Sequence, residues 1–306
     1  MIKIPPYLKK GDTVGILCPA GSMPLTKIKN CIATLKTWGY KVKCGNTLGK
    51  RNTYFSGSDK ERLNDFQQML NDKNVHAILC ARGGYGVSRI IDGIDFTEFR
   101  EHPKWIIGYS DITVFHAHIY TNYQTATLHS PMAGAFNDME NGELYLQTLH
   151  NALKGNTLIF ECAAHPLNRN GNAMGEIVGG NLSILVNLIG TSSEINSDGK
   201  ILFVEDVDEY IYQVDRMFVQ LKRCGKLNKL AGLVIGKFAG IKDTTLPFGK
   251  TVFETIREHV NEFDYPICFD FPVSHSSENV ALKHGVSHSL EVKRKKVKVE
   301  EIYSTL

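Results

Sequence analysis

Apolar and polar positions in the first half of the chain follow a repeated pattern of a short apolar run and then a helix-like stretch. The apolar runs end at turn residues, which is typical of buried strands. The expected strands span residues 13–20, 40–44, 75–81, 105–109 and 125–131. The expected helices span residues 27–38, 59–70, 111–120 and 143–154, with Ser58 capping the second. This alternation predicts a parallel sheet with helices on both faces.

The pattern changes after residue 154. Residues 155–175 are rich in Asn, Gly and Pro and are expected to be a connector. The strands expected beyond it span residues 175–180, 200–206, 230–240 and 265–275. The helices expected there span residues 181–190, 210–224 and 250–260. We therefore predict a domain at 1–154, a connector at 155–175 and a second domain at 176–306.

Residues 288–302 alternate apolar and charged positions with a period of two, which predicts a strand. The segment is basic, and its cations are Lys293, Arg294, Lys295, Lys296 and Lys298. It could be a binding patch. A solvated edge strand is the favoured interpretation, because lysines on a sheet edge discourage further pairing.

Composition narrows the class of protein. A length of 306 residues suits two domains, and a formal net charge of +3 gives no case for nucleic acid binding. No apolar run approaches the roughly 20 residues of a membrane helix, and the start "MIKIPPYLKKGD" is not expected to be a signal peptide. The seven cysteines form no CxxC pair, which favours free thiols in a reducing cytoplasm and no cysteine metal site.

Three expected strands are followed by small or polar residues: "CPAG" (18–21), "ARGGYG" (81–86) and "GYSD" (108–111). In open parallel sheets, ligands bind outside the carboxyl ends of the strands. The glycines of "RGGYG" let backbone N–H groups approach a ligand closely, which suits a phosphate or an oxyanion. They are also consistent with an ordinary turn.

Ser110 lies at the corner between an expected strand and an expected helix. It is either a helix N-cap or a nucleophile held on a sharp turn. A serine nucleophile needs a base and an orienting acid. Glu205 and Asp206 follow a buried run, and His275 ends another, with His129 as the rival base. The chain has no GxGxxG after a strand and no HExxH, so a dinucleotide cofactor and a zinc centre are disfavoured.

Taken in order, several segments resemble the LD-carboxypeptidase family of serine peptidases, which has the microcin C immunity peptidases as relatives. The matching segments are "GDTVGILCPAG", "YFSGSDKERLNDFQQMLND", "AILCARGGYG", "IIGYSDIT", "GEIVGGNLSIL", "LFVEDVDEYIYQVDRM" and "FPVSHSSENVALKHG". The resemblance implies an α/β fold with a Rossmann-like N-terminal domain on a parallel sheet and a β-rich α/β C-terminal domain. It further implies a homodimer, and an active site in the cleft between the domains.

The same resemblance implies a catalytic triad in which Ser110 is the nucleophile, Glu205 the acid and His275 the base. The family usually has glycine before this histidine and Gly-Pro after it, whereas this chain has Ser274 and then Ser276-Ser277. The shape of that loop is therefore expected to differ.

The oxyanion is expected to be bound by the Asp111 N–H and by a backbone N–H of Gly83 or Gly84. The expected substrate contacts are Arg82, Tyr85 and Glu278. Neither a cofactor nor a metal is implied.

The implied reaction is hydrolysis of an L,D-peptide bond that releases D-Ala from a murein tetrapeptide in peptidoglycan recycling. One alternative is degradation of a peptidyl-nucleotide antibiotic of the microcin C type. The other alternative is a non-catalytic protein that binds a phosphate or sugar at "RGGYG".

Overall fold

The structure is a computed structural model that describes residues 2–302. These residues form two units, one made by the chain up to Asn156 with Val280–His284, the other by Thr157–Asn279 with the residues from Gly285 onward. Both units are mixed α/β, which confirms the fold class expected from the alternation of strands and helices. Among the described residues, no helix is both long and apolar enough to cross a membrane.

The apolar runs of the first half form a six-stranded sheet in the order β11-β5-β4-β3-β1-β2. The strands are β1 (Thr13–Leu17), β2 (Lys41–Cys44), β3 (Val75–Cys80), β4 (Trp105–Gly108), β5 (Thr127–His129) and β11 (Leu282–His284). The first five are parallel, while β11 pairs antiparallel with β5. The strand order reverses between β1 and β3, and ligands of doubly wound sheets bind at such a switch point.

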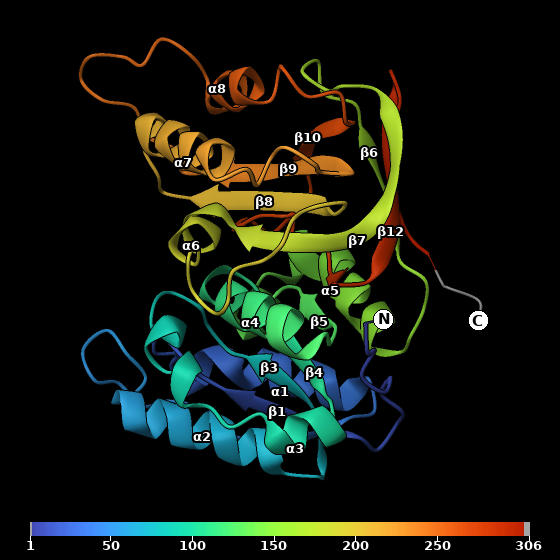
Figure 1. Cartoon of the computed structure of the whole chain (residues 1–306). Coiled ribbons are helices and arrows are strands. Elements are labelled where there is room, and N and C mark those ends of the chain that lie inside the picture. Colours follow the sequence, from blue (N-terminus) through green and yellow to red (C-terminus); the bar gives the residue numbers. More distant parts are fainter. Residues whose placement is uncertain (1, 303–306) are drawn as a thin grey trace. The chain divides into compact units, whose positions relative to one another are not determined.

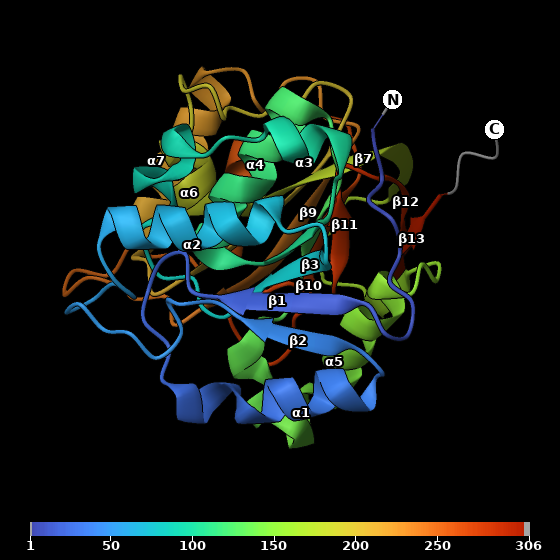
Figure 2. The same ribbon diagram turned by 90° about the horizontal axis from the view of Figure 1, so that it is seen from below.

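Helices cover both faces of this sheet, as the sequence predicts (Figure 2). They are α1 (Lys29–Thr37), α2 (Asp59–Asn71), α3 (Thr97–Glu101), α4 (Thr113–Tyr123) and α5 (Met139–Leu153). On one face, Trp38 at the end of α1 stacks on His150 of α5 at 4.3 Å between ring centroids. On the other, Phe66 of α2 stacks on Phe115 of α4 at 4.3 Å. Ser58 caps α2 as expected.

The second unit contains a seven-stranded sheet in the order β10-β9-β8-β7-β12-β13-β6. The strands are β6 (Ile159–Ala163), β7 (Gly171–Asn181), β8 (Ile201–Val207), β9 (Gly232–Ala239), β10 (Ile267–Phe271), β12 (Ser287–Val292) and β13 (Lys296–Glu301). The long, curved β7 joins the two parts of the sheet (Figure 1). Its first half pairs antiparallel with β12, and its second half pairs parallel with β8.

Three helices accompany the parallel strands of this sheet: α6 (Leu182–Asn187), α7 (Ile211–Arg223) and α8 (Val252–His259). The apolar residues of α7 recur at helical spacing and are buried, as the expected amphipathic segment requires. The helices α7 and α8 pack side by side (Figure 1), with His259 hydrogen-bonded to Asp215 at 2.8 Å. The parallel strands and helices thus form one α/β half of the second unit.

Two expectations for the second half are wrong. Residues 155–175 are not a plain connector, because they contain β6 and the start of β7. Both segments find partners far away in the sequence, since β6 pairs with β13 and β7 with β12. The basic segment 288–302 is not an edge strand. It folds back at residues 293–295 into the hairpin of β12 and β13, which lies between β7 and β6 inside the sheet.

Candidate active site

Ser110 is held in a strained backbone conformation at the carboxyl end of β4. Its φ is +65°, which costs a residue with a Cβ roughly 1–2 kcal/mol. The short 3-10 helix Ser110–Ile112 begins there, and α4 follows it. The N-cap positions of these two helices are Tyr109 and Ile112, so the alternative that Ser110 is a helix cap is wrong. Strain of this kind, retained at a strand end, indicates a functional constraint.

The glycine loop after β3 lies directly against Ser110. A Cβ placed on Gly83 would lie 2.9 Å from the Ser110 Cβ and 3.2 Å from the Asp111 backbone nitrogen. Only glycine therefore allows this approach of the two backbones. The carbonyl of Gly83 also accepts a hydrogen bond from the Gly21 N–H at 3.0 Å. The loops that follow β1, β3 and β4 thus meet at the switch point of the first sheet.

The side chain of Asp111 is hydrogen-bonded to the backbone at the end of the glycine loop. It is fully buried, and its Oδ2 accepts a hydrogen bond from the Val87 N–H at 2.8 Å. Burial raises the pKa of this carboxyl from 3.8 to about 6, although the Val87 N–H and the charge of Arg62 lower it. The Asp111 side chain is therefore structural, while its backbone nitrogen lies close to Gly83, 3.2 Å from where a Cβ on that residue would be.

Arg62 is a structural residue that the sequence analysis did not single out. Its guanidinium is fully buried, and Nη1 donates to the carbonyls of Pro19 at 2.6 Å and Gly86 at 2.8 Å. It thereby connects the loop after β1 to the glycine loop, and it forms an ion pair with Asp59. A signal was present in the sequence, because Arg62 stands four residues before Phe66 on the buried face of α2.

The two expected substrate contacts of the first unit lie on the glycine loop. Arg82 is exposed, and its Nη1 donates to the Ser22 carbonyl at 2.9 Å. Tyr85 is 46% exposed, and its ring lies 6.0 Å from that of Phe55. The structure thus gathers Ser110, its neighbouring N–H groups and two accessible side chains at one end of the first sheet.

Glu205 and His275 are brought together in the second unit. Glu205 follows Val204 near the end of β8, and His275 lies in the loop after β10. The imidazole Nδ1 lies 2.6 Å from the Glu205 Oε2, and the Glu205 side chain is fully buried. A carboxylate held this way orients an imidazole and stabilises its protonated form.

The pKa of His275 is set by two opposing influences. Burial alone lowers the pKa of the imidazole, but the hydrogen bond and charge of Glu205 oppose burial, with smaller contributions from Asp206 and Asp208. The acidic neighbours prevail, and the pKa of His275 is raised above its usual value of 6.5. The dyad is therefore tuned toward a more basic imidazole.

Asp206, the neighbour of Glu205, has different partners. Its Oδ1 accepts from the Asn181 side chain at 2.8 Å and its Oδ2 from the Ser183 N–H at 2.9 Å. Adjacent residues on a strand point to opposite faces, which explains the separation of the two carboxylates. Asp206 thus fixes the start of α6 to the end of β8.

Two candidate residues from the sequence analysis remain to be placed, Glu278 and His129. Glu278, an expected substrate contact, forms an ion pair with Lys237 at 3.1 Å. His129, the rival base, is fully buried at the end of β5. Its neighbour His116 is also fully buried, and its ring nitrogens lie 2.8 Å from the Thr127 hydroxyl and 2.8 Å from the Gly108 carbonyl.

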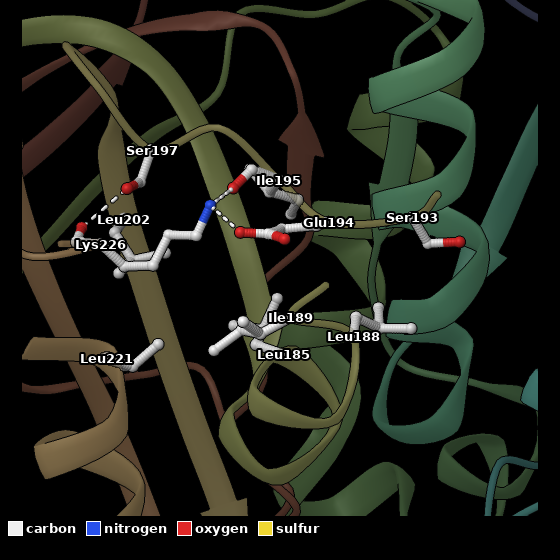
Figure 3. Close-up of a pocket in the computed structure, with 10 residues that line it drawn as sticks. All are labelled: Leu185, Leu188, Ile189, Ser193, Glu194, Ile195, Ser197, Leu202, Leu221 and Lys226. Atoms are coloured by element: carbon white, nitrogen blue, oxygen red, sulfur yellow. Dashed lines mark hydrogen bonds and ion pairs between the residues drawn. The ribbon is translucent and has the colours of Figure 1, made fainter. Parts of the chain in front are cut away.

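A small apolar pocket in the second unit contains none of the expected site residues (Figure 3). Its volume is about 30 Å³, which is room for one or two water molecules. Among the residues that line it, the Lys226 amine lies 2.5 Å from the Glu194 carboxylate and donates to the Ile195 carbonyl at 2.7 Å; Figure 3 draws both interactions as dashed lines. We interpret this pocket as a packing gap. Within residues 2–302, no three potential metal-ligating side chains gather.

A strained serine at a strand end of a doubly wound sheet, together with a hydrogen-bonded Glu–His pair held by a second α/β unit, is typical of a serine hydrolase. Residues 14–130 match the model of the LD-carboxypeptidase N-terminal domain, and residues 174–290 match that of the C-terminal domain. The chain belongs to the LD-carboxypeptidase family and is a hydrolase.

Similar proteins cover almost the whole chain. A probable murein peptide carboxypeptidase of Bacillus subtilis (strain 168) is 36% identical over 97% of this chain and 94% of its own. The microcin C7 self-immunity protein of Escherichia coli is 25% identical over 97% of this chain and 95% of its own. The crystal structure of a muramoyltetrapeptide carboxypeptidase from Oxalobacter formigenes has a TM-score of 0.87 and 26% identity, covering 94% of this chain and 98% of that one.

Proposed function

We propose that the protein is a serine carboxypeptidase that hydrolyses an L,D-peptide bond and releases D-Ala from murein tetrapeptide in peptidoglycan recycling. The 2.6 Å hydrogen bond between His275 and the buried Glu205 carries the chemical part of this proposal. The substrate rests on the similarity to the Bacillus subtilis and Oxalobacter formigenes proteins, whose names specify murein peptides.

In this mechanism, Ser110 is the nucleophile and His275 its general base. The Glu205 carboxylate accepts a hydrogen bond from the Nδ1–H group of His275, so that Nε2 carries the lone pair that takes the serine proton. The Ser110 oxygen then attacks the scissile carbonyl and forms an acyl-enzyme, with D-Ala leaving as the amine after protonation by the imidazolium. Water attacks the acyl-enzyme in the second half, again with His275 as the base.

The oxyanion is proposed to accept hydrogen bonds from the Asp111 N–H and from the N–H of Gly83 or Gly84. The close approach of Gly83 to Ser110 and to the Asp111 nitrogen supports this assignment. Such donors act without reorganisation, and losing one typically lowers kcat about 10²- to 10³-fold. Arg82, Tyr85 and Glu278 are proposed substrate contacts, of which Arg82 is the cation available to a peptide carboxylate.

The test is incubation of the purified protein with murein tripeptide, tetrapeptide and pentapeptide, followed by mass analysis of the products. D-Ala released from the tetrapeptide by the wild type, but not by Ser110→Ala, is the expected result. Cleavage of an aminoacyl-sulfamoyl nucleotide in place of the tetrapeptide would indicate the microcin-type activity. No hydrolysis, together with no covalent adduct of a fluorophosphonate probe at Ser110, would indicate a non-catalytic binder.

A cytoplasmic homodimer is also part of this proposal. All seven cysteines are free thiols, which fits a reducing compartment. The homodimer rests on the family resemblance and is tested by light scattering after size-exclusion chromatography. A monomer mass at micromolar protein concentration would exclude it.

A further inference from the structure

Serines stand on both sides of His275, and the side chain of Ser274 is fully buried. Its Oγ donates to the Glu278 carbonyl at 2.9 Å and accepts from the Ser276 N–H at 2.9 Å. The Ser276 hydroxyl lies 2.7 Å away and supplies a third hydrogen bond. One hydroxyl donor and two acceptor positions are the full capacity of a serine, so Ser274 is saturated.

The hydrogen bonds close residues 274–279 into a loop with His275 at its beginning. The Ser276 Oγ accepts from the Glu278 N–H at 3.2 Å. The Asn279 Oδ1 accepts from the Ser274 N–H at 3.3 Å, which joins the two ends of the loop. The backbone on both sides of the imidazole is thus fixed by one buried hydroxyl.

A salt bridge attaches the same loop to the sheet. Lys237 on β9 lies 3.1 Å from the Glu278 carboxylate and 3.3 Å from that of Asp270. Its backbone N–H donates to the Val273 carbonyl at 3.0 Å, directly before Ser274. The loop therefore has a fixed start and a fixed end, and the Ser274 hydroxyl connects them.

We propose that Ser274 is a positioning residue, whose buried hydroxyl holds the His275 imidazole on the Glu205 carboxylate. Ser274 acts through the loop and does not touch the substrate. This role rests on the proposed function, because it makes His275 the general base.

Removing the hydroxyl should loosen the dyad rather than unfold the sheet. Ser274→Ala leaves the Glu278 carbonyl and the Ser276 N–H without their shared partner, so the loop loses the hydroxyl that holds its two sides together and has to rearrange. Misplacement of a reacting group by about 1 Å costs roughly 10²-fold in rate. We expect kcat to fall 10- to 100-fold, with KM changed less than about twofold.

The experiment compares wild type, Ser274→Ala and the matched control Ser277→Ala, which changes a neighbouring serine outside this network of hydroxyls. Two measurements are made on each: steady-state hydrolysis of murein tetrapeptide between pH 5 and 9, and the low-field proton NMR signal of the His275 Nδ1–H. In Ser274→Ala we expect lower kcat, a pH profile that moves to lower pH, and a weakened or lost low-field signal. Ser277→Ala should match the wild type in both.

The NMR signal separates this inference from the proposed function, because it needs no substrate. A wild type without hydrolytic activity, but with a low-field signal lost in Ser274→Ala, would refute the function and support the positioning role. If Ser274→Ala retains the signal and kcat within twofold, the positioning role is wrong. Should Ser274→Ala fail to fold, Ser276→Ala removes two hydrogen bonds of the same network, and an unchanged signal and kcat there also refute the inference.

Discussion

Replacing Glu205 by Gln removes the charge that faces the imidazole and keeps the size of the side chain. With about 4 Å between charge centres and an effective dielectric constant of about 20, the attraction to an imidazolium is about 4 kcal/mol. That attraction corresponds to roughly 10³-fold in rate. The amide can also hold His275 in the wrong tautomer, and in a related triad the neutral substitution costs about 10⁴. We therefore expect kcat to fall about 10³- to 10⁴-fold.

The pH dependence of kcat/KM tests the role of Glu205 independently of the loss in rate. A base works when neutral, so the wild-type kcat/KM should rise with pH through a pKa above 6.5, because acidic neighbours raise the pKa of His275. In Glu205→Gln, burial still lowers the pKa of His275, but the charge of Glu205, which opposes burial in the wild type, is removed. The residual rate should then rise at a lower pH than in the wild type.

The assay is D-Ala release from murein tetrapeptide, measured from pH 5 to 9 with thermal unfolding followed on the same samples. The matched control is Glu176→Gln on β7, which breaks the ion pair with Lys200 and makes the same chemical change in the same unit. The control should stay within about twofold of the wild type. Near-normal kcat in Glu205→Gln, with an unshifted profile, would refute the assignment of Glu205 as the acid.

Three further predictions concern other residues and metal dependence. Ser110→Ala should abolish turnover with folding intact. In urea unfolding, Ser110→Gly should be about 1 kcal/mol more stable than Ser110→Ala, because glycine adopts the positive φ of this position without strain. Equal stabilities of the two variants would contradict the strain at Ser110. Asp206→Asn should reduce kcat less than Glu205→Gln. Burial raises the Asp206 pKa to about 6, so the folded state binds this proton more tightly than the unfolded state does. The free energy of unfolding of the wild type should therefore fall as pH rises from about 4 to 6, and in Asp206→Asn this fall, measured by urea unfolding, should be shallower. EDTA should leave activity unchanged, and loss restored by zinc would exclude the metal-free mechanism.

The sequence predicts the first unit well because its strands are apolar, short and separated by amphipathic helices. The expected strand at 75–81 is β3, and the expected helix at 59–70 is α2, with its cap. Here local pattern and tertiary environment agree, since a parallel strand buried on both faces is a continuous apolar run.

The second unit was less predictable because its sheet depends on distant partners. β6 pairs with β13 across more than a hundred residues, and its own sequence alternates only weakly. The same difficulty holds for β11, which belongs to the first unit: it is only three residues long and joins β5 of that unit from late in the chain. Hydrogen bonds to a partner so far away in the chain leave no periodic signal in a short segment.

The candidate site, like the fold, was only partly predictable from the pattern of the sequence. The strand ends locate the glycine loop and Ser110, because a turn residue after an apolar run is visible in the sequence. The roles of Glu205 and His275 came from family resemblance, and chain pattern alone left His129 as a rival. What excludes a purely local account is that the Glu205–His275 bond joins residues seventy positions apart. Arg62 was missed because its residue type suggests an exposed cation, and only its spacing from Phe66 on α2 indicates burial.

In both units, a buried aspartate directly follows a proposed catalytic residue and accepts a hydrogen bond from the backbone of a neighbouring segment. Asp111 follows Ser110 and accepts the N–H of Val87, the first residue of a 3-10 helix. Asp206 follows Glu205 and accepts the N–H of Ser183, near the start of α6. Burial raises the pKa of both aspartates to about 6, so each costs stability at neutral pH. A cost retained twice at the same relative position is best explained by precision: each aspartate fixes a neighbouring segment beside a proposed catalytic residue, the nucleophile Ser110 in one unit and the acid Glu205 in the other.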